Sequence, residues 1–420
     1  MSRTSLVCFA SLVVLGALGC GGSGGTTKTG GIGGGSAGGT TTPTGGTGGT
    51  AMAGAGGHAP GGAGGHATGD AGGSTLTGGA GGGIGGAGGG AGVPVALATG
   101  FVHGHAVAVD ATNVYFIGDG WHEAGGINYE VRLMQVPKIG GTPVMRYASV
   151  QEGPAPGIAL DAANVYFCGS NYHTMYVPIA GGDAVDLTPT LTDFGDGAGA
   201  LCEGIDVDTD YVYSAGGNDP VIWRMPKTGG TPVEFAGNPT TPPSVTWVRH
   251  FRAVDGTSGY WLYEGSAFYA IERAPVAGGG PSPLASTDPA GGGALDMNVS
   301  FINENLVVWN GYLYWARGGD QTIWSLPVTG GTPKKLIAAS GTIVQGQIAT
   351  DGTSIYWNQQ NSQSYSVQKM PIAGGSQTIV VQDPYASSGG YGVTIAVDGT
   401  SVYWLSISAA LVTTLYKAPK

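Results

Sequence analysis

Residues 395–404 read Ile-Ala-Val-Asp-Gly-Thr-Ser-Val-Tyr-Trp: an apolar run, an Asp-Gly turn, and a second apolar run that ends in an aromatic pair. An aspartate at the head of such a turn can bond its own backbone two residues on, and glycine accepts a positive φ. The stretch therefore predicts two antiparallel strands joined by a tight turn. In most copies of this pattern a third run ends in a proline, and a Gly-Gly turn leads to a fourth run, as at Pro327 and Gly330-Gly331. Proline fits near a strand end because it cannot donate to the ladder.

The pattern repeats along most of the chain with a period of about 47 residues. Its seven copies begin at Val107, Ile158, Ile205, Arg252, Leu306, Ile348 and Ile395. A repeat of this length with four strand-like runs is typical of a β-propeller blade. We therefore expect an all-β fold: a seven-bladed β-propeller of four-stranded blades.

Two residue types recur at fixed places in the copies. The tyrosines are Tyr115, Tyr166, Tyr213, Tyr260, Tyr314, Tyr356 and Tyr403, and the turn aspartates are Asp110, Asp161, Asp208, Asp255, Asp351 and Asp398. A residue that every blade repeats serves the blade, so we interpret both sets as turn formers and packing between blades. The fifth copy has Asn310 and a shorter turn instead, which an Asn-Gly pair tolerates.

The two ends of the repeat region complement each other. The seventh copy reaches Lys420 without its Gly-Gly turn and outer strand, whereas residues 92–98 read like the outer strands of other copies. We expect one blade to be built from both ends, with an N-terminal strand, Val93 to Ala98, closing the ring and removing its open edge.

The runs that begin at Asp351 and Asp398 resemble those of bacterial YWTD, NHL and TolB-like propellers. The resemblance covers about three quarters of the chain and implies the architecture, not a ligand. Two features differ: the Tyr-Trp pair is not followed by Thr-Asp, and YWTD-type rings usually have fewer blades.

The residues before the repeats predict export and a lipid anchor. Residues 1–19 carry Arg3 and an apolar run too short to span a membrane, which is typical of a signal peptide. The run ends before Cys20 in a sequence that resembles a lipobox, which implies lipidation of Cys20; ordinary cleavage with a free thiol is the alternative. Residues 20–91 are Gly-rich and predict a disordered tether before the propeller, residues 92–420. By family analogy, Gly21 in place of Asp favours the outer membrane or cell surface of a Gram-negative bacterium.

Composition limits the partners. The formal net charge is −11 with only 16 Lys and Arg, which argues against nucleic acid. We expect a monomer that meets the membrane only through its lipid. In an oxidising compartment, Cys168 and Cys202 would form a disulfide, because both are expected near the same face of adjacent blades. The alternative is two buried thiols.

The predicted connections differ between the two faces. Turns on one face are short, whereas the other connections, such as 188–201 and 285–298, are long, and variable loops on a rigid scaffold usually carry binding. Aromatic residues in or near these loops could stack on sugars or anchor a peptide: Trp121, Tyr172, Trp247 and Tyr391. Alternatively, they fold back over their own blades.

At one position that the copies share, near this face, three copies carry an ionisable residue. Five residues before the turn aspartates stand His105, Glu203 and His250, with Asn305 at the matching place in the fifth copy. Imidazole and carboxylate suit a divalent transition metal, with Asn305 as an outer partner. The alternative is a set of polar residues that only line the channel mouth, and no cofactor is then expected.

Two functions therefore remain open. The first is a lipid-anchored, non-enzymatic binding or scaffold module for a protein or glycan. The second is a propeller enzyme, a lyase or hydrolase, with a metal-assisted site at the channel mouth on the loop side. The chain has no HExxH, GxSxG or Walker motif, so no catalytic residue is assigned.

Overall fold

The computed structural model describes most of the repeat region. The described residues are 92–101, 104–120, 130–150, 157–169, 173–188, 202, 204–215, 221–236, 245–265, 269–286, 306–317, 321–361, 364–383, 394–408 and 412–420. The predicted signal peptide, Cys20 and tether lie outside them and stay predictions. Among the described residues, no helix is long and apolar enough to cross a membrane.

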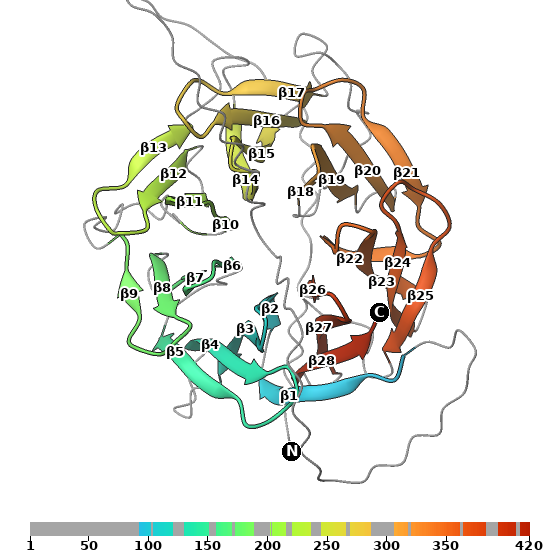
Figure 1. The fold of residues 1–420 in the computed structure, drawn as a ribbon. Helices are drawn as coiled ribbons and strands as arrows, with labels where there is room; N and C mark the ends of the chain where they lie inside the picture. Colours follow the sequence, from blue (N-terminus) through green and yellow to red (C-terminus); the bar gives the residue numbers. More distant parts are fainter. Residues whose placement is uncertain are drawn as a thin grey trace, which may run out of the picture. The chain divides into compact units, whose positions relative to one another are not determined.

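The described residues form seven four-stranded antiparallel sheets arranged as a ring (Figure 1), which confirms the predicted seven-bladed propeller. Blade 1 contains β2 (Gly104–Val109), β3 (Asn113–Gly120), β4 (Glu130–Pro137) and β5 (Val144–Val150). Blade 2 contains β6 (Ile158–Leu160), β7 (Asn164–Cys168), β8 (Thr174–Pro178) and β9 (Val185–Asp186). Blade 3 contains β10 (Gly204–Val207), β11 (Tyr211–Ala215), β12 (Ile222–Pro226) and β13 (Val233–Ala236).

The remaining blades repeat this order from the channel outward. Blade 4 contains β14 (Val245–Val254), β15 (Ser258–Gly265), β16 (Tyr269–Pro275) and β17 (Ser282–Ser286). Blade 5 contains β18 (Leu306–Trp309), β19 (Tyr312–Arg317), β20 (Thr322–Pro327) and β21 (Lys334–Ala338). Blade 6 contains β22 (Thr342–Thr350), β23 (Ser354–Asn361), β24 (Ser364–Pro371) and β25 (Thr378–Asp383). Blade 7 contains β26 (Ile395–Val397), β27 (Ser401–Ile407) and β28 (Thr413–Pro419), and its outer strand is β1 (Val95–Phe101).

The N-terminal strand closes the ring, as predicted. β1 pairs antiparallel with β28, with Val95 opposite Lys417 and Thr99 opposite Thr414. The backbone N–H of Gly92 also donates to the carbonyl of Val380 in blade 6, at 2.9 Å. The strand lies further along the chain than the predicted Val93 to Ala98, because its ladder with β28 continues through two irregular positions to Phe101.

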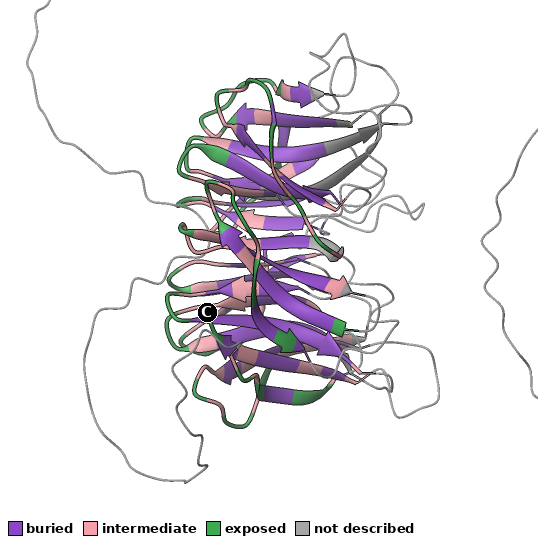
Figure 2. Cartoon of the chain, turned by 90° about the vertical axis from the view of Figure 1, so that its right-hand side faces the viewer, coloured by how far each residue is buried: buried purple, intermediate pink, exposed green. Residues whose placement is uncertain are grey.

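The core lies between the blades, in the packed surfaces that we call seams. The largest side chains with almost no exposed surface include Trp261, Trp315, Trp357 and Trp404, which occupy the same place in four blades. Trp261 of blade 4, for example, belongs to an apolar cluster with Tyr213 and Phe235 of blade 3. Figure 2 shows that the buried parts of the strands run through the ring, whereas the described turns at one side are exposed.

Six turns share one hydrogen-bonded unit, which we call the Asp–Tyr clasp. One carboxylate oxygen of Asp351 accepts from the backbone N–H groups of Thr353 and Ser354, at 2.9 and 2.8 Å. The other accepts from the hydroxyl of Tyr356, at 2.8 Å. The same bonds recur at Asp110, Asp161, Asp208, Asp255 and Asp398.

Blade 5 departs from the clasp. Asn310 and Gly311 both have positive φ, at 47° and 77°, in a two-residue turn that no aspartate heads. The neighbouring Trp309 instead lies against Gly352 of blade 6, where an added Cβ would come within 2.4 Å of its ring. At this turn, blade 5 thus packs an indole against a glycine of blade 6, whereas the other blades form the Asp–Tyr clasp within the blade.

Candidate functional site

The strand bounds divide the connections between two faces. Turns from first to second strand, and from third to fourth, lie on one side, which we call the tight-turn face. Chain segments 187–203 and 287–305 connect consecutive blades on the opposite side, the loop face. Trp121, Tyr172 and Tyr391 lie outside the described residues. Trp247, which was predicted in or near a loop, lies within β14 close to its start at Val245; its side chain is not among those described.

The shared register of the candidate ligands coincides with irregular pairing. On β2 the ladder shifts between Gly104 and Ala106, on either side of His105, whose side chain is half-buried. On β14 it shifts between Arg249 and Phe251, on either side of His250. Bulges re-aim a side chain, and they are over-represented next to active sites. Glu203 and Asn305 lie just before β10 and β18, outside the described residues.

The ring does not bring the two histidine strands together. β2 belongs to blade 1 and β14 to blade 4, and Figure 1 shows them on opposite sides of the channel. Within the described part of the chain, no group of three or more His, Cys, Asp or Glu residues could hold a metal ion. The predicted metal site therefore depends on residues that the structure does not describe, and it stays a prediction.

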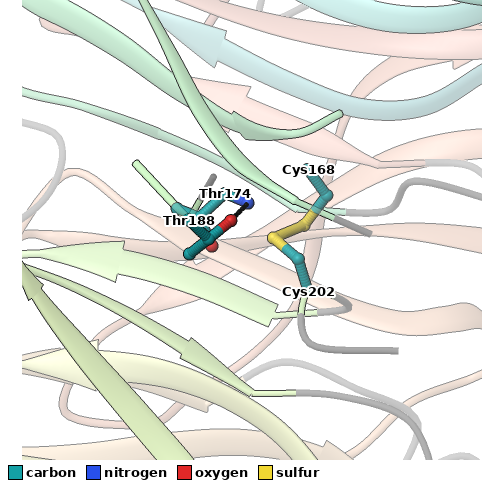
Figure 3. Close-up of a disulfide and its surroundings, with 4 residues drawn as sticks. All are labelled: Cys168, Thr174, Thr188 and Cys202. Atoms are coloured by element: carbon teal, nitrogen blue, oxygen red, sulfur yellow. Dashed lines mark hydrogen bonds between the residues drawn. A yellow bond between two sulfur atoms is a disulfide. The ribbon is translucent and has the colours of Figure 1, made fainter. Parts of the chain in front are cut away.

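A disulfide ties the loop-face ends of blades 2 and 3. It joins Cys168, the last residue of β7, to Cys202, shortly before β10, with the Cα atoms 5.3 Å apart (Figure 3). This is the pairing expected from the sequence, and both cysteines are fully buried. The bridge fixes the chain immediately before Glu203, at the end of the 187–203 connection.

Blade 2 adds a polar cluster near this bridge. The Nδ1 atom of His173 lies 2.6 Å from the Oδ2 atom of Asp186. The other carboxylate oxygen of Asp186 accepts from the backbone N–H of Thr188, and the Thr188 hydroxyl accepts from the N–H of Thr174 (Figure 3). These contacts hold the short strand β9 against β8 and leave a histidine at the edge of the loop face.

The tight-turn face carries ion pairs between blades that the sequence reasoning missed. Lys138 of blade 1 contacts Asp398 of blade 7 at 2.6 Å, Lys227 of blade 3 contacts Asp161 of blade 2 at 2.8 Å, and Lys420 of blade 7 contacts Asp351 of blade 6 at 2.6 Å. Each lysine directly follows the proline that ends a third strand, so a lysine at that place was the available signal.

These pairs shift the titration of the carboxylates. Burial alone raises the pKa of Asp351, but the hydrogen bond from Lys420, with those of the turn, more than offsets it and holds the pKa well below 3.8. The same balance lowers the pKa of Asp398, where Lys138 is the partner. Groups with these shifts often mark functional sites, but here each repeats a structural turn, so we assign the tight-turn face to stability.

No protein-family model matches the sequence, and a search of curated proteins gives no match. Among solved structures, the chain is similar to virginiamycin B lyase from Staphylococcus aureus, with a TM-score of 0.54, 12% identity and coverage of 78% of this chain and 98% of the lyase. It is similar to YCF48 bound to D1 peptide, with a TM-score of 0.51, 12% identity and coverage of 78% and 97%. A putative TolB from Agrobacterium tumefaciens gives a TM-score of 0.43, 15% identity and coverage of 66% and 94%. At these identities the likeness shows the β-propeller fold alone.

Proposed function

We propose that this chain is an exported, lipid-anchored binding or scaffold module whose loop face recognises a protein or a glycan. The observation that carries the proposal is that the two faces differ: one has short turns that are fixed by repeated hydrogen bonds, and the other has long connections. Six repeated turns of the tight-turn face engage their aspartates in clasps, and lysines from neighbouring blades engage three of these aspartates again. The loop face carries the long connections, which vary from blade to blade, as recognition surfaces do.

Two features support export. The Cys168–Cys202 disulfide is typical of an oxidising compartment, and the sequence up to Cys20 reads as a signal with a lipidation site. The Gly-rich residues 21–91 would then separate the propeller from the bilayer. A peptide partner accords with the fold, since the structurally similar YCF48 is bound to D1 peptide.

A screen tests the binding proposal. Full-length protein would be presented to a glycan array and to a library of extended peptides, and each ligand found would be titrated against variants of both faces. We expect Trp121→Ala and Tyr391→Ala, in predicted loops, to weaken binding at least tenfold. The matched control is Ile139→Glu on the tight-turn face, where Ile139 is 95% exposed. Equal losses from the control, or binding lost only through the control, would reject the loop face as the binding surface.

The alternative is a lyase or hydrolase with a metal-assisted site at the channel mouth. The irregular pairing that flanks His105 and His250 favours it, and one of the structurally similar propellers is a lyase by name. Here His105, Glu203 and His250 would bind a divalent metal with Asn305 outside them, leaving one coordination position open. Metal analysis of the purified chain separates the two proposals. Stoichiometric zinc or manganese that His105→Ala and His250→Ala both abolish supports the enzyme, and metal-free protein that binds its ligand supports the module.

A further inference from the structure

Glu272 lies in the interior of blade 4. It occupies the middle of β16, opposite Trp261 of β15 and Pro283 of β17, and its side chain is only 5% exposed. Its Oε2 atom is buried and has no hydrogen-bond partner within the described part of the chain. An ionised carboxylate is costly in such a place, because the charge loses its water without gaining a cation.

The other blades place no carboxylic acid and no basic side chain at this position. Counting three residues back from the proline of each third strand gives Met134, Met175, Trp223, Trp324, Gln368 and Tyr416. Directly opposed residues of an antiparallel ladder share one face of the sheet. Because Trp261 packs against Tyr213 and Phe235 of blade 3, Glu272 also faces the seam between blades 3 and 4. A carboxyl group thus stands where other seams have thioether, aromatic or amide groups.

The charged groups around this seam are engaged elsewhere. On β12, Arg224 lies over the rings of Tyr211 and Phe235 at 4.9 and 5.8 Å and donates to the carbonyl of Val276 at 2.8 Å. On β16 itself, Arg273 donates to Val328 of blade 5, in the next seam. On β10, Asp206 accepts from the backbone N–H of Val254 of blade 4 at 3.0 Å, across this seam, and from that of Val207. Two other described acids of blade 3 are Asp208, which accepts from Tyr213, and Glu234 of β13, which is exposed.

The pKa of Glu272 reflects this environment. Burial raises the pKa of Glu272 from 4.5 to about 7, and the neighbouring Trp261 acts in the other direction. The folded chain therefore keeps a proton that the exposed group would lose, so ionisation favours any state in which the seam is open.

Among its described residues, the same seam has no Lys–Asp ion pair of the kind found at three others. Val276 stands where Lys138, Lys227 and Lys420 reach the aspartate of the preceding blade. The disulfide crosses the seam between blades 2 and 3 instead. The contacts described at the seam with the buried acid are apolar packing, the hydrogen bond from Arg224 to Val276 and the hydrogen bond from the Val254 N–H to Asp206.

We propose that the seam between blades 3 and 4 is a pH-responsive joint, closed while Glu272 is protonated and opening reversibly when Glu272 releases its proton to water. β14, which carries His250, forms the inner wall of this joint, so opening would alter the loop face at blade 4. The inference depends on the seam alone and stands whichever ligand the loop face binds.

Hydrogen exchange of the full-length protein tests this proposal. Exchange is followed by mass spectrometry from pH 4.5 to 8.5, and the rates are corrected for the intrinsic pH dependence of amide exchange. In the wild type, the opening equilibrium for peptides of β13, β15 and β16 should rise by up to about 300-fold, tenfold for each unit between 4.5 and about 7. Peptides of β24 and β27, at the seam between blades 6 and 7, serve as the reference and should change far less.

Two variants separate charge from packing. Glu272→Gln keeps the shape without an ionisable group, and Glu272→Met copies the residue of blades 1 and 2. Both should lose the pH dependence at β13, β15 and β16, and either folded variant suffices for the test. Wild-type protection that does not change with pH, an unchanged pH dependence in the variants, or equal opening of every seam would each overturn the proposal.

Discussion

Asp351 and Asp255 form a matched pair for measuring what an inter-blade lysine adds to a turn. Both accept from two backbone N–H groups, a threonine hydroxyl and a tyrosine hydroxyl. Only Asp351 also accepts from a lysine, Lys420, at 2.6 Å, and the two side chains of that pair are 10% and 15% exposed. Changing each aspartate to asparagine keeps one oxygen and replaces the other by an amide that cannot accept.

The magnitudes follow from the bonds lost. Asp255→Asn loses the bond from Tyr260, which is worth about 1 kcal/mol of unfolding free energy. Asp351→Asn loses the bond from Tyr356 and also leaves the Lys420 ammonium without its acceptor, so we expect a loss of about 3 kcal/mol. Urea unfolding at neutral pH measures both. Equal losses in the two variants would refute the idea that the lysine strengthens the clasp.

The pH dependence adds a second readout. The folded pKa of Asp351 lies below its ordinary value of 3.8, so the unfolded chain binds the proton first as pH falls. The stabilisation is therefore complete above about pH 5 and is lost progressively toward stronger acid. The gap between Asp351→Asn and wild type should narrow over that range, and a gap that stays constant down to acid unfolding contradicts the pKa shift.

Three further predictions concern the ring. Gly352→Ala should lower the free energy of unfolding by about 2–3 kcal/mol, because the residue has a φ of +84° and its new Cβ would meet Trp309. Gly399→Ala should change it by less than about 0.5 kcal/mol, because nothing lies within 4 Å of the new Cβ. Equal melting temperatures of the two variants would contradict this. Deleting residues 1–91 should leave thermal stability unchanged, whereas deleting 1–101 removes β1 and should cost several kcal/mol; identical melting of the two truncations would reject closure by β1. Digestion of unreduced exported protein should yield one linked peptide pair containing Cys168 and Cys202, and free thiols at both would exclude the bridge.

The repeat carried most of the fold. Because each copy has the same pattern of turns and strands, a copy that is hard to interpret alone can be assigned from the others. The number of blades and the closure of the ring could therefore be predicted from the sequence. Strand ends were less predictable. β14 and β22 begin earlier than expected, at Val245 and Thr342, because their pairing continues through irregular positions that no turn residue marks in the sequence.

The side-chain contacts between blades were harder to predict, because each depends on two residues from different copies. Within each blade, the turn aspartates and the tyrosines were interpreted as turn formers and packing between blades, and the hydrogen bond from the tyrosine to the second carboxylate oxygen was not predicted. A lysine follows the proline that ends the third strand in three copies only, so an argument from the repeat passes over Lys138, Lys227 and Lys420. The candidate ligands share a register, but register alone does not fix the distance across a ring, and His105 and His250 come from strands on opposite sides of it.

The central claim is that the loop face binds the ligand. Its most direct test is hydrogen exchange of the full chain, measured with and without the ligand that the screen identifies. We predict slower exchange in peptides that cover 121–129, 189–201 and 287–305. Peptides that cover the tight turns at 138–143, 227–232 and 328–333 should exchange at the same rate in both states. Protection confined to those turns, with none in the long connections, would contradict the account.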